Sequence, residues 1–140
     1  MAASKYPPNK TSFITAALVA ALPFAADVLV FGSTGRAELI FQDFGILLFN
    51  AAFASAPFIF IGLVMRPRQS VTRALWVGFA LTVIVWAAYA ASGRHYGLSH
   101  EGGNLNLALF MILMIWPFLV TIIMGLIGKY EPGRAVAPDA

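Results

Sequence analysis

Four long apolar segments alternate along the chain with short stretches that hold most of the charged residues. The segments cover residues 12–31, 44–65, 74–91 and 105–127. A helix of about 20 residues rises about 1.5 Å per residue and so crosses the ~30 Å hydrocarbon layer of a membrane. The pattern therefore predicts an all-α, integral membrane four-helix bundle with short loops, in which consecutive helices are antiparallel.

The composition agrees with this prediction. The 140 residues are 60% hydrophobic and 11% charged, with a mean hydropathy of +0.82, whereas soluble domains have about 25% charged residues. Outside the four segments there remain three loops and two tails, at residues 1–11 and 128–140. We therefore expect a single transmembrane domain without a separate catalytic domain.

The basic residues are distributed unevenly between the loops. Seven lie in the two tails and the middle loop: Lys5, Lys10, Arg66, Arg68, Arg73, Lys129 and Arg134. The other two loops hold Arg36 and Arg94 together with the acidic residues Glu38, Asp43 and Glu101. The positive-inside rule then predicts a bacterial-type inner membrane protein with both termini in the cytoplasm. This distribution explains the net charge of +3 without a nucleic-acid partner.

Helical periodicity predicts which face of each segment lies inside the bundle. In the first segment, Ala16, Ala20, Pro23 and Asp27 share one face, and Leu18, Leu22 and Leu29 lie nearly opposite. Small and polar residues favour close helix packing in a membrane. The same periodicity gives three further interior faces: Asp43, Asn50, Ala54, Pro57 and Ile61; Leu75, Gly78, Thr82, Trp86 and Tyr89; and Asn106, Phe110, Leu113, Pro117, Met124 and Gly128.

Asp27 is an ionisable residue inside an apolar segment, where a carboxylate costs at least a few kcal/mol unless it is paired or hydrated. The expected topology places it about one turn from the outer interface, at a depth near Asn50, Tyr89 and Asn106. A functional interpretation makes Asp27 a proton or cation site supported by Asn50 and Tyr89. In a structural interpretation, the Asp27 carboxyl instead holds the helices together. It would accept a hydrogen bond from Asn50 or Asn106 or pair with Arg36 or Arg94.

The last loop contains a second group of candidates: Arg94, His95, His100 and Glu101. Histidine and carboxylate side chains bind metals or pigments, and this loop would also suit a quinone headgroup. The two histidines are five residues apart, which is not the spacing of a helical ligand pair, so the sequence requires no metal or other cofactor. The chain has no cysteine, which excludes disulfides, thiolate ligands and thiol catalysis.

Three functions remain open at this level. The first is a non-enzymatic accessory protein that interacts with other membrane proteins, for example as a subunit of an electron-transfer or photosynthetic complex. The second is a small transporter or channel that uses Asp27 with Asn50 and Tyr89; four spans rarely enclose a pore alone, so this function implies a homo-oligomer. The third is a quinone- or metal-binding redox protein that uses the last loop.

Overall fold

The computed structural model describes residues 9–33, 35–96 and 103–130, and within them the side-chain surroundings of all but residues 94–96 and 103–110. This part of the chain consists of helices and turns, without strands, which confirms the predicted all-α, four-helix bundle. The four long helices and one short 3₁₀ helix are α1 (Lys10–Ser33), η1 (Ala37–Leu39), α2 (Phe44–Val64), α3 (Gln69–Tyr96) and α4 (Gly103–Lys129).

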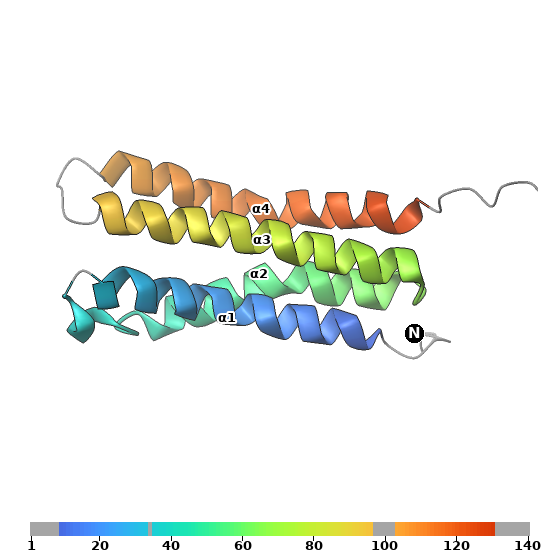
Figure 1. Cartoon of the computed structure of the whole chain (residues 1–140), viewed down its shortest axis with the longest axis horizontal. Coiled ribbons are helices and arrows are strands. Elements are labelled where there is room, and N and C mark those ends of the chain that lie inside the picture. The colour runs from blue at the N-terminus through green and yellow to red at the C-terminus, as the bar shows by residue number, and fades with distance from the viewer. Residues whose placement is uncertain (1–8, 34, 97–102, 131–140) are drawn as a thin grey trace, which may run out of the picture.

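The helices form two layers, with α1 and α2 in one and α3 and α4 in the other, and consecutive helices run in opposite directions (Figure 1). The most extensive contacts join α1 to α2, α3 to α4 and α1 to α3, followed by α2 to α4. Helices α2 and α3 touch only slightly. The order around the bundle is therefore α1, α2, α4, α3, with α2 and α3 on a diagonal.

Three of the helices extend beyond the apolar segments that predicted them. Helix α1 begins at Lys10 because the Asn9 side chain caps it, its Oδ1 accepting a hydrogen bond of 3.0 Å from the Thr11 N–H. Helix α3 continues to Tyr96, so Arg94 and His95 lie in its last turn, where the sequence predicted a loop. The helices are longer than the apolar segments because hydropathy identifies only the part of a helix that suits the membrane, whereas the helical hydrogen bonds continue into the polar residues beyond it.

The predicted interior faces are largely confirmed. On α1, Ala16 and Pro23 are buried, whereas Leu18 and Leu29 are 43% and 56% exposed. The prediction was wrong for Leu22, which is partly buried against both core clusters because α1 contacts α3 as well as α2. The main core fills the half of the bundle nearest the first residues of α1, and its members include Val19, Phe58, Ile61, Leu75 and Met124. A smaller cluster of Ala26, Trp86 and Ala90 joins α1 to α3 in the other half.

Close approach and polar contacts hold the helices together. Gly62 of α2 lies against Ser12 of α1, leaving no room for a Cβ atom, and Ser12 Oγ donates a hydrogen bond of 2.8 Å to the Phe58 carbonyl. Between α3 and α4, Trp116 Nε1 donates to Thr82 Oγ1 at 3.0 Å. Small residues and interhelical hydrogen bonds are the means by which helices associate where burial of apolar surface gives little driving force.

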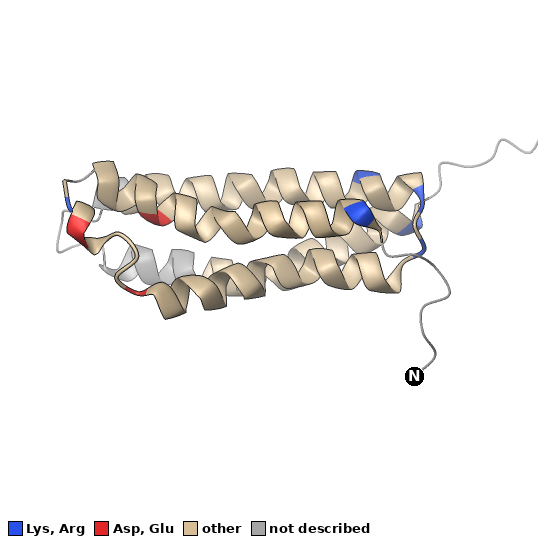
Figure 2. Cartoon of the chain, turned by 90° about the horizontal axis from the view of Figure 1, so that it is seen from below, with Lys and Arg blue, Asp and Glu red and all other residues tan. Residues whose placement is uncertain are grey.

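All four helices are long and apolar enough to cross a membrane. Large apolar side chains are exposed on each of them, including Phe13 on α1, Phe60 on α2, Ile84 on α3 and Phe118 on α4. Among the described residues, Lys and Arg gather mainly at the end of the bundle where α1 begins, and Asp and Glu lie towards the other end (Figure 2). We call these the basic end and the acidic end. This architecture is consistent with a membrane protein.

Candidate functional site

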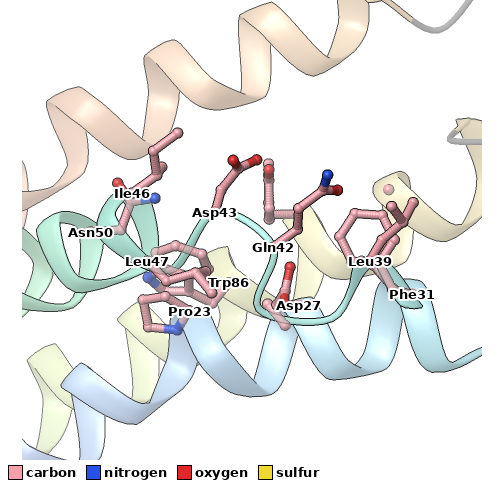
Figure 3. A pocket seen from close by; sticks show the side chains of 14 residues that line it. Pro23, Asp27, Phe31, Leu39, Gln42, Asp43, Ile46, Leu47, Asn50 and Trp86 are labelled. Carbon is pink, nitrogen blue, oxygen red and sulfur yellow. The ribbon is translucent and has the colours of Figure 1, made fainter. Parts of the chain in front are cut away.

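A pocket of about 380 Å³ lies near the acidic end, between α1, the beginning of α2 and the end of α3 (Figure 3). Polar, aromatic and aliphatic side chains all contribute to its lining. The residues that line it are Pro23, Ala26, Asp27, Val30, Phe31, Leu39, Gln42, Asp43, Ile46, Leu47, Asn50, Trp86, Tyr89 and Gly93. Its volume is near the lower end of the range found for small-molecule sites, about 300–1,000 Å³.

Three residues singled out in the sequence meet at this pocket. Asp27 comes from α1, one turn after Pro23, Asn50 comes from α2, and Tyr89 comes from α3. Trp86 lies one turn before Tyr89, and the two rings are in an edge-to-face arrangement with centroids 5.7 Å apart and an interplanar angle of 79°. The fourth candidate, Asn106, is in α4, but its side chain is outside the described part of the structure.

The observed partner of Asp27 is a backbone group. Its Oδ2 accepts a hydrogen bond of 2.8 Å from the N–H of Phe41, which adopts a left-handed conformation with φ of 60°. The Phe41 ring also packs edge-on against Phe24 of α1, with centroids 6.0 Å apart. Asp27 therefore holds the connection between α1 and α2 against α1. This role is structural, but its partner is the Phe41 backbone and not one of the side chains that the sequence suggested.

The described lining of the pocket is acidic. It holds the carboxylates of Asp27 and Asp43 and the amides of Gln42 and Asn50, and no Lys, Arg or His is among the described lining residues. Asp43 is the N-cap residue of α2 but makes no capping hydrogen bond through its side chain. Two carboxylates beside low-dielectric walls produce a negative local potential, which favours a cation.

Sequence reasoning did not assign Trp86, Gln42 or Asp43 to a site. For Trp86 the sequence left open a ligand pocket but favoured packing, and the side chain does both: it is buried within the small α1–α3 cluster and lines the pocket. Gln42 and Asp43 precede α2 and resemble ordinary helix caps. Helical periodicity could have assigned Asp43 to the site, because Asp43 and Asn50 are seven residues, or two turns, apart and so share one face of α2.

The candidates in the last loop cannot be placed relative to this pocket from the described residues, although Gly93, which precedes Arg94, lines it. Arg94 and His95 belong to the last turn of α3, but their side chains are outside the described part, as are His100 and Glu101 entirely. Among the described residues, no three His, Cys, Asp or Glu side chains come together in a way that would hold a metal ion. The metal or quinone hypothesis for this loop stays a prediction.

A second, smaller cavity of about 240 Å³ opens on the outside of the bundle between α2 and α4. It lies where Pro57 and Pro117 occur in the two helices, and its lining is almost entirely apolar. The rings of Phe53 and Phe118 meet edge-on there, with centroids 6.0 Å apart. This groove has the character of a surface that contacts lipid chains or another apolar helix.

The described lining of the pocket at the acidic end carries groups that bind ligands. The described lining residues are carboxylates, amides, aromatic rings and aliphatic side chains, with no Ser, Thr, Cys or His among them. Carboxylates, amide oxygens and aromatic rings together are suited to holding a positively charged group. No protein-family model matches the chain, and neither a curated protein nor a solved structure matches it.

Proposed function

We propose that this protein binds a cationic solute at the acidic end of its bundle and transports it as a homo-oligomer, with Asp27 as the principal binding carboxylate. The observation that carries this proposal is the pocket in which Asp27 meets Asn50 and Tyr89. Asp27 lies about 9 Å along α1 from the end of the helix at Ser33, at ~1.5 Å per residue. A carboxylate held at that depth beside a cavity is a typical position for an ion or substrate site.

The proposal of a homo-oligomer rests on the packing of the bundle, which has a pocket in one half and a packed apolar core in the other. Beyond the pocket, Phe58, Leu75 and Met124 are fully buried and close the centre of the bundle. A solute that enters the pocket therefore meets a packed core within one chain. A route across the membrane would run along an interface between copies, as small multi-span transporters require.

The charge distribution supports an orientation with the pocket on the outer side. Five basic residues lie where α1 begins, α2 ends, α3 begins and α4 ends, which is the basic end: Lys10, Arg66, Arg68, Arg73 and Lys129. Since basic residues stay in the cytoplasm, this end, and with it both termini, would face the cytoplasm of a bacterial-type inner membrane. The pocket would then receive its solute from outside.

Charge movement in proteoliposomes tests the proposed function. On a solid-supported membrane, rapid addition of Na⁺, guanidinium or an alkylammonium salt should give a transient current for at least one of these cations. Asp27→Asn should reduce that current about tenfold or more, because the bound cation loses its main counter-charge. Glu38→Gln is the matched control: Glu38 is exposed on η1 and does not line the pocket. Equal currents from wild type and Asp27→Asn, or none from either, would contradict the proposal.

A second candidate function is the accessory subunit of a larger membrane complex, which the groove between α2 and α4 favours. A partner's transmembrane helix seated there would cover Phe60 and Phe118, which are now exposed. We expect such a partner to remain bound during purification in a mild detergent, and Phe118→Ser to release it. An absorption spectrum of the purified material would show whether the complex carries a pigment or redox cofactor. A colourless protein that purifies alone would count against this candidate.

A further inference from the structure

We infer that the ligand of the acidic pocket is a small organic ammonium cation with an aromatic or branched apolar body, rather than a bare metal ion. This inference rests on the proposed function, since it specifies the cation that the pocket would bind. It follows from three properties of the pocket: the placement of charge, the aromatic wall and the size.

The charge placement suits a single cationic head. Asp27 and Asp43 supply two carboxylates, and Gln42 and Asn50 add amide oxygens that accept hydrogen bonds from an ammonium group. The hydrogen bond from the Phe41 N–H holds the Asp27 carboxylate in place. A carboxylate fixed in this way loses little side-chain entropy when the cation binds.

The aromatic and aliphatic walls suit an apolar body. Trp86 and Tyr89 both line the pocket, with their rings edge-to-face, and Trp and Tyr rings are preferred partners of ammonium groups through cation–π attraction. Val30, Ile46 and Leu47 complete the lining with aliphatic surface. A hydrated alkali ion gains nothing from these groups, whereas an organic cation contacts them with its carbon atoms.

The size and donor set argue against a metal ion. The cavity of about 380 Å³ is far larger than one ion requires. Divalent metals such as Ca²⁺ take about six to eight oxygen ligands at 2.3–2.6 Å, whereas the described lining offers two carboxylates and two amides, and no three His, Cys, Asp or Glu side chains of the described residues come together. A molecule of about ten heavy atoms matches the volume of the pocket better.

Binding of a matched set of small molecules tests the inference. The protein in lipid nanodiscs would be titrated by calorimetry with 2-phenylethylammonium, with the neutral 2-phenylethanol and with the anionic 3-phenylpropanoate, which share one aromatic body. Ethylammonium and Na⁺ test the charged head without the body, and empty nanodiscs correct for partition into lipid. We expect saturable binding of 2-phenylethylammonium, at least about tenfold tighter than that of any other member of the set.

Three variants connect that binding to the pocket. Asp27→Asn keeps an oxygen that accepts the Phe41 N–H, so the connection stays in place while the charge is removed; we expect affinity to fall about tenfold or more. Trp86→Phe keeps a ring of weaker cation–π character, and we expect a loss of about threefold. Glu38→Gln removes a carboxylate outside the pocket and should leave affinity unchanged. Circular dichroism and gel filtration would confirm that each variant is folded.

The outcomes separate this inference from the proposed function. Asp27-dependent binding of Na⁺, with 2-phenylethylammonium neither binding nor competing, would overturn the organic ligand but leave a cation site. Equal binding of the ammonium and the alcohol, unchanged in Asp27→Asn, would overturn both and indicate an apolar cavity. Absence of saturable binding by every member of the set would also overturn both.

Discussion

Replacing Phe58 with alanine should lower the free energy of unfolding by about 3 kcal/mol. The Phe58 ring is 0% exposed and lies in the main core, so its removal leaves a cavity that lipid cannot reach. The backbone carbonyl that accepts the Ser12 Oγ hydrogen bond remains, so the loss reports packing alone. To measure this loss in the free energy of unfolding, the protein would be unfolded in mixed micelles that contain an increasing fraction of a denaturing detergent. Circular dichroism would follow the unfolding.

Phe60→Ala is the matched control for this prediction, since the same side chain is removed two residues further along α2. Phe60 is 52% exposed on the outside of the bundle, where detergent or lipid fills the space that the ring leaves. We expect a loss below about 1 kcal/mol, as for surface substitutions. A larger loss for Phe60→Ala than for Phe58→Ala would mean that α2 presents a different face to the core.

The number, direction and interior faces of the helices could be predicted from the sequence because membrane spans have strong and simple signals. A run of apolar residues gives the helix, and small or polar residues such as Ala16, Gly78 and Thr82 mark its packed side. Helix ends were less predictable. The last turn of α3, which contains Arg94 and His95, is polar, so hydropathy alone does not distinguish it from a loop.

The site could be predicted only in part. Asp27, Asn50 and Tyr89 could be grouped from their depth in the membrane, and they do line one pocket. The hydrogen bond between Asp27 and Phe41 could not be predicted, since it depends on how the connection folds back over α1. The sequence also did not predict which helices are neighbours. In the structure α2 and α3 lie on a diagonal and α1 packs against α3, so Asp27 of α1 lies next to the face of α3 that carries Trp86.

The central claim is that the pocket is open to water at the outer end of the bundle and selects for positive charge. The chain has no cysteine, so a single introduced cysteine can be labelled without background. Asn50→Cys places a thiol in the pocket, and Gln69→Cys places one at the basic end, where α3 begins. Two membrane-impermeant methanethiosulfonate reagents, one carrying a trimethylammonium group and one a sulfonate, differ mainly in charge.

The most direct test is the ratio of the reaction rates of these two reagents with Asn50→Cys in right-side-out membrane vesicles. The account predicts labelling from outside, with the cationic reagent faster by about tenfold beyond the ratio for a free thiol, because a negatively charged cleft concentrates cations. Adding Asp27→Asn should bring this ratio most of the way to the free-thiol value, whereas adding Glu38→Gln should not.

Gln69→Cys should react only after the vesicles are permeabilised. A free-thiol ratio at Asn50→Cys, or labelling of Gln69→Cys but not Asn50→Cys from outside, would contradict the account.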